Sequence, residues 1–274
     1  MKIILSRKGF DSSSGGCPNP IMPDGALLSL PIPDDTVLTP PVPAEIVKYD
    51  DLRYGDYTYT DILKGIKPNQ VFGNCHLDPD IREGIRIKPI NGWKPAFGQT
   101  GSPLGVLRNA GVTAGDLFLF FGVFRKAERH AGSVRFIKGV KPIQIVYGYM
   151  QIGEILESPN DIAVYNWHPH AYGTHYDKDK NALYLPSEKL SFCPTLPGYG
   201  ILPYRADRVL TKPGENAATW EEHSFLMPDN IVGNRKNCSK GAGLYYAGQW
   251  QELVLKPNKE ADRWAANLLA GGSV

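Results

Sequence analysis

Apolar residues in this chain occur in short runs that turn residues interrupt. Residues 2–7 contain the run Ile3-Ile4-Leu5. Unbroken apolar character over so short a stretch predicts a strand that is buried on both faces, in the middle of a sheet. Residues 26–32 form a second apolar run, which ends at Pro33. Many short strands joined by turns fit this pattern better than a bundle of helices.

Two longer apolar runs predict the main strands of the sheet. Residues 116–124 include an unbroken apolar stretch at 117–121, and residues 143–156 form the other run. We expect these two strands to pair as an antiparallel hairpin with a long, charged connection. Shorter strands are predicted over residues 182–185, 208–211 and 243–255.

Helical periodicity is confined to three segments, of which residues 60–65 are the weakest. Ser102-Pro103 is a favourable helix start, because an N-cap residue precedes proline at the first helical position. Gly111 would end that helix. The clearest helix opens at Pro257-Asn258. Its apolar stripe has helical spacing and comprises Ala261, Trp264, Ala265, Leu268 and Leu269.

These elements predict an α+β, β-rich fold with a mixed sheet or partly closed barrel and a few peripheral helices. The 274 residues are 42% hydrophobic and 21% charged, as is usual for a globular protein. A proline-rich connection over residues 33–45 is interpreted as extended surface chain. Because we find no internal repeat and no linker, we interpret residues 1–274 as a single domain.

The charge distribution is more informative than the net charge, which is only +2. Residues 123–142 hold a single acid, Glu128, among basic side chains. Such a run could follow a phosphate backbone, or it could be a solvated hairpin with a charged tip. Both interpretations stay open. The basic residues are Arg125, Lys126, Arg129, Arg135, Lys138 and Lys141.

Cysteine spacing and the N-terminal residues predict a cytoplasmic protein. Cys17, Cys75, Cys193 and Cys238 lie far apart in the sequence, so we expect reduced thiols and no zinc site of closely spaced ligands. The opening residues are too few and too soon charged for a signal peptide. No apolar run is long enough to span a bilayer, so no membrane partner is expected.

The segment 6–16 is dense in groups that can bind or react, directly after a predicted central strand. Arg7 could hold a phosphate, and Asp11 could serve as a base or stabilise a developing cation. The glycines allow close backbone approach to an anion. A polar turn capped by an aspartate is the alternative interpretation of the same residues. The binding candidates in this segment are Arg7, Lys8, Ser12, Ser13 and Gly15.

Two histidine-containing segments are further candidates. His76, Asp78 and Asp80 fall within five residues, and they could bind a metal or move a proton. A simple turn is the alternative, and Pro79 would hold the two carboxylates apart. In the segment 167–170, His168 and His170 flank a proline. A metal site that includes His175 is conceivable there, but hydrogen bonding to a substrate is favoured.

Gln99 precedes the predicted helix start at Ser102. Its amide offers both a donor and an acceptor and could therefore contact the edge of a base. Helix N-termini also attract anions. A capping loop is the alternative interpretation.

The order of several motifs carries a family resemblance over nearly the whole chain. The opening SRKGFDSSSGG at residues 6–16 resembles the start of the nucleotide modification associated domain 3 family. Motifs further along the chain are similar to that family too: HLDPD at 76–80, FGQ at 97–99, GDLFLFFG at 115–122, GYMQIG at 148–153, HPH at 168–170, LY at 183–184 and GQWQE at 248–252.

The resemblance implies a protein that acts on modified bases in DNA, most simply a DNA glycosylase of antiviral defence. Asp11 would be the first choice for the catalytic carboxylate and Asp78 the second. His168 or His170 would assist the departing base. In the same scheme Arg7 and Lys8 hold phosphates, His76 and Gln99 contact the substrate, and Arg125, Lys126, Arg129 and Arg135 follow the nucleic-acid backbone. Neither a metal nor another cofactor is expected.

Two other classes of function remain open. One is a reader that binds modified bases and performs no chemistry, in which Asp11 is structural. The other is a transferase or hydrolase that acts on free nucleotides. It would lose little activity on neutralisation of Arg125, Lys126 and Arg135.

Overall fold

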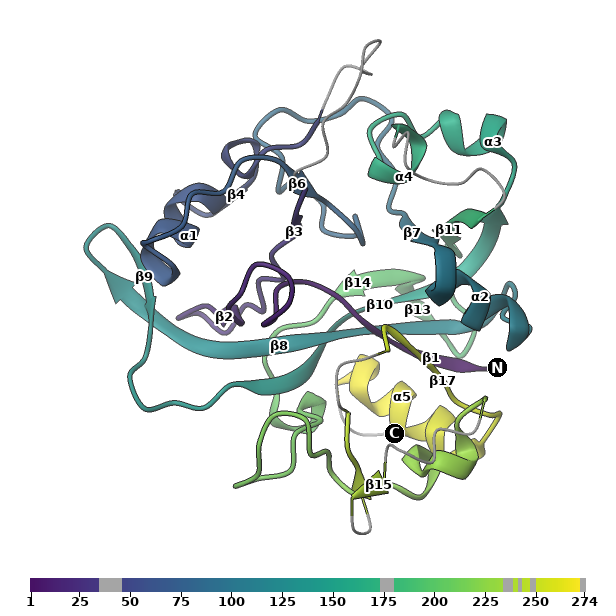
Figure 1. Ribbon diagram of the computed structural model, residues 1–274. Coiled ribbons are helices and arrows are strands. Elements are labelled where there is room, and N and C mark those ends of the chain that lie inside the picture. The colour runs from purple at the N-terminus through teal and green to yellow at the C-terminus, as the bar shows by residue number, and fades with distance from the viewer. Residues whose placement is uncertain (35–45, 173–179, 234–238, 241–242, 247–249, 272–274) are drawn as a thin grey trace.

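The computed structural model describes residues 1–34, 46–172, 180–233, 239–240, 243–246 and 250–271. A curled mixed sheet forms its centre, and helices lie on both sides of it (Figure 1). The order along the sheet is β17 (Glu252–Val254), β1 (Ile3–Arg7), β8 (Leu117–His130), β10 (Ile143–Leu156), β11 (Asn181–Pro186) and β7 (Phe97–Thr100).

β1 lies inside the sheet, as its unbroken apolar run predicts. It pairs parallel with β8 and antiparallel with β17, whereas the other neighbours in this order pair antiparallel. Three short strands complete the sheet: β2 (Asn19–Ile21) and β9 (Ser133–Phe136) lie against β8, and β14 (Tyr199–Ile201) lies against β10. The predicted β-rich α+β fold with a mixed, partly closed sheet is confirmed.

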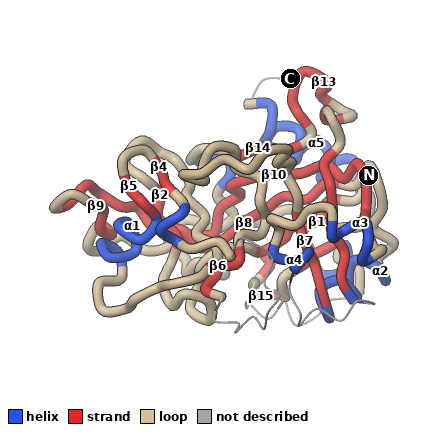
Figure 2. Tube along the Cα trace, turned by 90° about the horizontal axis from the view of Figure 1, so that it is seen from above, coloured by secondary structure: helices blue, strands red, loops and turns tan. Residues whose placement is uncertain are grey.

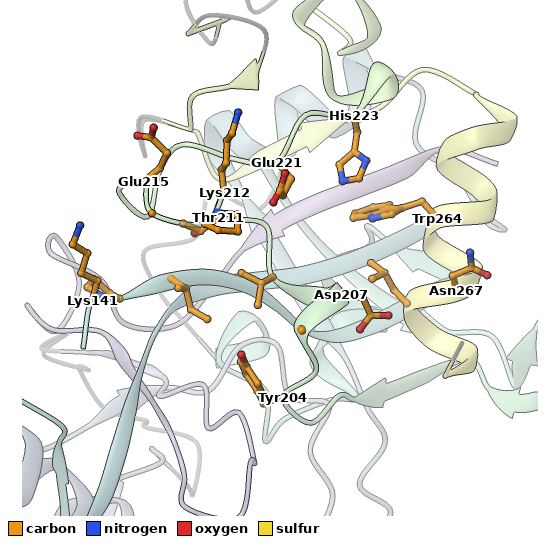
Figure 3. A pocket seen from close by; sticks show the side chains of 17 residues that line it. Lys141, Tyr204, Asp207, Thr211, Lys212, Glu215, Glu221, His223, Trp264 and Asn267 are labelled. Carbon is orange, nitrogen blue, oxygen red and sulfur yellow. The ribbon is translucent and has the colours of Figure 1, made fainter. Parts of the chain in front are cut away.

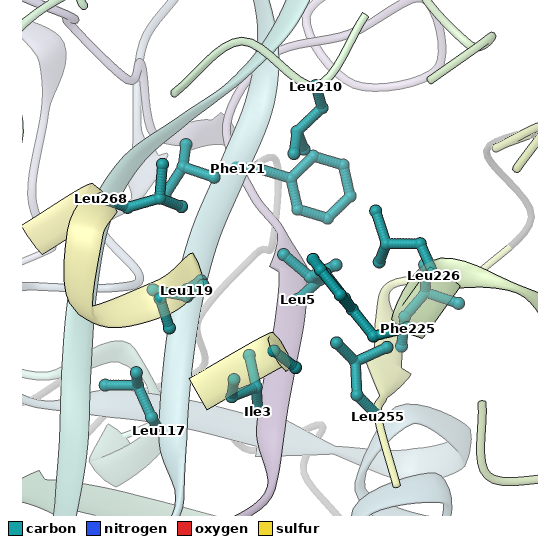
Figure 4. Close-up of a cluster of buried hydrophobic side chains, with 14 of the residues drawn as sticks. Ile3, Leu5, Leu117, Leu119, Phe121, Leu210, Phe225, Leu226, Leu255 and Leu268 are labelled. Carbon is teal, nitrogen blue, oxygen red and sulfur yellow. The ribbon is translucent and has the colours of Figure 1, made fainter. Parts of the chain in front are cut away.

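Alternating side chains of the central strands fill a separate core on each face of the sheet. Leu5 and Phe121 belong to the core beneath α5 (Lys259–Ala270), with Leu268 of that helix (Figure 4). Ile4 and Phe120 belong to the opposite core, which α2 (Gly101–Asn109) helps to cover.

A third core forms around Phe10, Tyr49 and the apolar face of α1 (Tyr59–Ile66), with contributions from the far end of β8 and from β9. Short strand pairs frame this core and the sheet: β3 (Ile32–Pro33) with β6 (Cys75–His76), β4 (Arg53–Tyr54) with β5 (Tyr57–Thr58), β12 (Lys189–Leu190) with β13 (Cys193–Pro197), and β15 (Ser239–Lys240) with β16 (Gly243–Leu244). Among the described residues the remaining helices are α3 (Pro159–Ala163) and α4 (Pro169–Tyr172), with 3-10 turns at Tyr49–Asp51, Ala206–Arg208, Ser224–Leu226 and Pro228–Asn230.

Several predicted elements are confirmed closely. β10 has the predicted bounds, and all three predicted helices are present. α5 begins after Asn258, whose side chain accepts hydrogen bonds from the backbone of Glu260 and Ala261. α2 begins two residues earlier than predicted, because its N-cap residue is Thr100 rather than Ser102. Ser102 and Pro103 therefore lie in its first turn.

The apolar run at residues 26–32 does not form a strand over its length. Leu27 makes only an isolated bridge, and Ile32 begins the two-residue β3. The leucines of this run divide between two cores, with Leu27 in one and Leu30 in another. The backbone N–H of Leu30 donates to the side chain of Asn19 at 2.8 Å. A side-chain acceptor thus replaces the sheet ladder, and the run is buried without being a strand.

Two strand predictions need correction. Residues 208–211 make only isolated bridges, and residues 243–255 are divided between β16 and β17. The strand predicted over 116–124 continues to His130. β9 folds back on this extension, with Glu128 opposite Arg135. Much of the basic run therefore lies on paired strands rather than in a free connection, although β8 and β10 do pair antiparallel as predicted.

The expectations for membrane spans, cysteines and the proline-rich connection can be compared with the described residues. Among the described residues, no helix has the length and apolarity needed to cross a membrane. Cys17, Cys75 and Cys193 are free thiols, as predicted, and Cys238 lies outside the described residues. Residues 35–45, which include most of the proline-rich connection, also lie outside them. The single domain and the cytoplasmic location stay predictions.

A buried ion pair stabilises the chain between β6 and β7. Asp80 is fully buried, and both its oxygens accept hydrogen bonds from Arg86, at 3.0 and 2.6 Å. The indole N–H of Trp93 also donates to this carboxylate, at 2.9 Å. Asp80 and Asp78 thus have separate partners, as the intervening proline predicts, and Asp80 is a structural residue.

We expect Asp80→Ala to lower the free energy of unfolding by about 3–5 kcal/mol, because it leaves the buried Arg86 guanidinium without its partner. Urea denaturation measures the loss. Glu128→Ala is the control: its ion pair with Arg135 is exposed, and its loss should cost less than about 1 kcal/mol. Equal losses in the two variants would contradict the assignment.

Candidate functional site

Segments far apart in the sequence meet at one cavity of about 330 Å³. We call it the histidine–aspartate pocket. It lies where β1 ends, beside β6, β7 and α4, which are neighbours in both views (Figures 1 and 2). Residues from each of these segments line it, among them Lys8, Asp11, His76, Asp78 and His170. Two of the three predicted catalytic residues, Asp11 and Asp78, therefore share one pocket.

Asp78 lies at the centre of the polar contacts in this pocket. Its side chain is 5% exposed, and its Oδ1 accepts a hydrogen bond from the backbone N–H of Gly98 at 2.7 Å. His168 Nε2 lies 3.4 Å from the same oxygen, and His170 Nε2 lies 4.0 Å from Oδ2. Burial by itself would raise the pKa of Asp78. The contact with His168 and the charge of Lys8 outweigh it and hold this pKa well below its usual range.

The hydrogen bonds of the two imidazoles assign their protons. The backbone N–H of His170 donates to His168 Nδ1 at 3.3 Å, so the proton of His168 is on Nε2, which faces Asp78. Asn181 donates to the carbonyl of His170 through Nδ2, at 2.9 Å. The Oδ1 of Asn181 must then accept from His170 Nδ1, at 2.7 Å. This places the lone pair of His170 on Nε2, the nitrogen nearer Asp78.

Burial keeps the pocket histidines neutral. Desolvation lowers the pKa of His76 to about 4 and that of His170 to about 3, although the nearby Asp78 carboxylate acts in the opposite direction. The two rings are 5.3 Å apart in an edge-on contact. At neutral pH the pocket therefore offers uncharged imidazoles beside an ionised carboxylate.

Gly98 is required by the close approach of His170. A Cβ at this position of β7 would lie 2.2 Å from Cδ2 of the His170 ring. Because such a contact is impossible without movement, any larger residue would displace the imidazole or the strand. The same residue also donates its backbone N–H to Asp78. Glycine thus lets one strand hold both groups.

A second buried carboxylate, Glu252, lies behind Lys8. Its Oε1 accepts hydrogen bonds from Ser6 Oγ at 2.9 Å and from Gln99 Nε2 at 2.6 Å, and Lys8 Nζ is 3.6 Å away. Lys8 Nζ also lies 4.3 Å from the centre of the Phe97 ring. Burial raises the pKa of Glu252, and the charge of Lys8 offsets only part of this effect. The network fixes Lys8 at the wall of the pocket.

Asp11 shapes the N-terminal loop. Its Oδ1 accepts hydrogen bonds from the backbone N–H groups of Ser13 and Ser14 and from Ser13 Oγ, each at 2.7 Å. Its Oδ2 pairs with Arg7 Nη1 at 2.8 Å. Both oxygens are therefore engaged, in a turn that presents Arg7 at the pocket.

The other predicted binding residues are divided. Ser12 and Ser13 are exposed and do not line the pocket. Gly15 has a positive φ of 76° and packs on the Phe10 ring, which a Cβ would strike at 2.2 Å. Gln99 lines the pocket, but its Oε1 accepts from the backbone of Thr100 and its Nε2 donates to Glu252.

His168 is fully buried and contacts two residues that line the pocket, Asp78 and His170. It does not line the cavity. His175, the third histidine considered for a metal site, lies outside the described residues.

The predicted backbone-binding residues lie on β8 and β9, at the opposite end of the molecule from α4 and β7 (Figure 1). Lys126, Arg129 and Arg135 are exposed. Arg125 is partly buried, donates to the carbonyl of Ile137 at 2.8 Å and lies over the Phe136 ring. These cations form a surface of their own, separate from the lining of the pocket.

A larger cavity of about 800 Å³ lies between α5 and the segment 204–215 (Figure 3). Trp264 and Tyr204 contribute aromatic surface, and Lys212 pairs with Glu222 at 2.7 Å. None of the predicted catalytic or substrate-binding residues lines this cavity. Its charged residues Lys141, Asp207 and Glu215 are exposed, in contrast to the buried carboxylate of Asp78 in the histidine–aspartate pocket.

Sequence reasoning missed Glu252 and Asn181. Glu252 did fall in the GQWQE motif of the family resemblance, but a charged residue beside an apolar strand gives no signal of burial. Asn181 begins β11 and had no motif. Within the part of the chain that the structure describes, one group of residues could hold a metal: the ligand atoms of His76, Asp78 and His170 all lie within 4.8 Å of one another.

Comparison with known proteins identifies one relationship. A family model described as nucleotide modification associated domain 3 matches residues 2–257, which confirms the resemblance. Neither a curated protein nor a solved structure matches the chain.

The raised pKa of Glu252 predicts a pH dependence of stability. The folded protein binds this proton more tightly than the unfolded chain, whose reference pKa is 4.5. The free energy of unfolding should therefore fall as the pH rises from that value through the folded-state pKa. Glu252→Gln keeps an oxygen for Ser6 and Gln99 and should lack this part of the decline. Urea denaturation between about pH 4 and pH 8 compares the two proteins, and parallel pH profiles would contradict the assignment.

Proposed function

The chain belongs to the nucleotide modification associated domain 3 family, and from this premise we propose that it hydrolyses the N-glycosidic bond of a modified base in DNA. The observation that carries the proposal is the histidine–aspartate pocket, where an ionised carboxylate, two cations and neutral imidazoles surround one cavity of about 330 Å³. An enzyme that cleaves this bond takes the target nucleotide out of the base stack and into such a pocket. In a bacterial cell the activity would serve defence against viruses with modified DNA.

The charges of the pocket match those of the reaction. Cleavage of the bond develops positive charge on the sugar and negative charge on the departing base. A carboxylate beside the sugar stabilises the first or holds the attacking water, as in glycoside hydrolysis. Arg7 and Lys8 supply positive charge for the flanking phosphates.

Asp78 fits the role of that carboxylate better than Asp11. Asp11 already accepts three hydrogen bonds on one oxygen and pairs with Arg7 through the other, so it fits a positioning role for Arg7. Asp78 is held ionised, with Oδ2 directed to the side of the pocket where His170 lies. His168 then positions Asp78. His170 carries its proton on Nδ1, where it is donated to Asn181, so the departing base takes up its proton from solvent.

One observation favours a second candidate, the hydrolysis of free modified nucleotides. The exposed cations of β8 and β9 lie at the far end of the molecule from α4 and β7 (Figure 1), and Arg7 and Lys8 alone suffice for the phosphate of a mononucleotide. A reader without chemistry would use the same pocket for binding only.

The activity test uses DNA that carries hydroxymethylated or glucosylated cytosine. We expect alkali-labile abasic sites with the wild-type protein, and Asp78→Asn should slow their formation about 10²–10⁴-fold, because it removes the negative charge beside the sugar. Asp11→Asn is the matched carboxylate control and should retain far more activity.

The outcomes of this test separate the candidates. Tight binding of modified DNA without abasic sites would support the reader. Release of base from mononucleotides alone would support the second candidate. Full activity of Asp78→Asn would refute the assigned mechanism.

A DNA substrate also predicts a role for the exposed cations. Replacing Lys126 and Arg129 by alanine should weaken DNA binding and lower the salt dependence of log K by about one unit for each lost phosphate contact. Fluorescence anisotropy at several salt concentrations measures both. Removal of Lys212, which pairs with Glu222 at the other cavity, is the control. An unchanged salt slope would exclude these strands from the DNA interface.

A further inference from the structure

We infer that His76, Asp78 and His170 bind a divalent transition-metal ion in the histidine–aspartate pocket. Two imidazoles and one carboxylate are the donor set that zinc and its first-row neighbours accept. The three ligand atoms lie within 4.8 Å of one another, and His170 Nε2 is 4.0 Å from Asp78 Oδ2. Ligands of a tetrahedral ion with bonds of about 2.1 Å are roughly 3.4 Å apart, so modest side-chain rotations would complete the site.

The surrounding hydrogen bonds direct the correct atoms to the ion. Metal-binding histidines generally donate their other ring N–H to a fixed acceptor, and His170 does so to Asn181 Oδ1 at 2.7 Å. Asp78 receives the backbone N–H of Gly98 and the contact with His168 on Oδ1. Its Oδ2, on the side of His170, is then the oxygen for the ion. These contacts fix the orientation of the His170 ring and of the Asp78 carboxylate, which could otherwise rotate.

The pocket has room and charge for the ion. Three protein ligands leave a position for water, which is typical of catalytic rather than structural zinc sites. The cavity of about 330 Å³ reaches His76, Asp78 and His170 alike. The ammonium of Lys8 opposes a second cation, but Glu252 lies 3.6 Å from it and offsets its charge.

The ion adds a defined step to the proposed function. A water molecule on the open position loses a proton to solvent, and its oxygen forms a bond to the anomeric carbon of the sugar. The bond from that carbon to the base nitrogen breaks, and its electron pair leaves with the base, which takes up a proton. In the metal-bound protein Asp78 binds the ion, and the ion, rather than the carboxylate, activates the water. This step rests on the proposed function, whereas metal binding itself does not.

Metal binding is tested without substrate. Chelator-treated wild-type protein is titrated with Zn²⁺ by calorimetry and with Co²⁺ by visible absorption, which reports nitrogen and oxygen ligands. We expect one ion per chain, and His76→Gln and His170→Gln should each weaken binding at least about tenfold. Asn181→Ala, which leaves all three ligands in place, should weaken it about 10–100-fold.

His223→Gln is the matched control, because His223 lines the other cavity, and it should bind the ion like wild type. Circular dichroism confirms that each variant is folded. Absence of binding to the wild type, or binding that the His76 and His170 variants leave unchanged, would overturn the inference.

The same preparations separate this inference from the proposed function. If the chelator-treated protein binds no ion in the titration but still releases base, the metal site is refuted and the glycosylase proposal stays intact. Stoichiometric binding that depends on His76 and His170, without base release from any modified DNA, would support the metal site and count against the glycosylase.

Discussion

A carboxylate that is almost wholly removed from solvent must find compensating partners, and Asp78 finds them on three different segments of the chain. The backbone of β7, the imidazole of His168 and the field of Lys8 together keep its charge inside the protein. A buried charge without such partners would cost several kcal/mol or would be neutralised. The positions of β6, β7, α4 and the end of β1 are therefore coupled through a single side chain.

The mixed sheet explains why these segments can meet. β1 ends at Arg7 beside β17, which carries Glu252, and the curl of the sheet brings β7, at the other end of the strand order, back against Lys8. Ser6 pairs with Glu252 in the β1–β17 register, and Gln99 of β7 reaches the same carboxylate. The two buried carboxylates have opposite pKa shifts, with Asp78 lowered and Glu252 raised. Such divergence is characteristic of sites that use ionisable groups for different tasks, although networks of purely structural ion pairs produce it too.

The sequence predicts the regular elements better than the site. The unbroken apolar run at Ile3 and the long run from Ile143 identify β1 and β10, because strands buried on both faces need little else to specify them. The leucines after Ala26 form an apolar run without being a strand, because they are buried in two different cores. His76, Asp78 and His170 are visible as motifs, but their convergence depends on the pairing of β11 with β7 and on the hydrogen bond from Asn181. Glu252 is 246 residues from its partner Ser6, and no local pattern indicates that contact.

We propose that the Asp78-centred pocket breaks the bond between a modified base and its sugar. Mass spectrometry of the small molecules released from modified DNA tests it most directly, because a free base, a nucleoside and a nucleotide differ in mass. We expect free modified base with the wild-type protein, little with folded Asp78→Asn, and none from unmodified DNA. Release of intact nucleosides or nucleotides, or equal release of base by wild type and Asp78→Asn, would refute the role of Asp78 in base release.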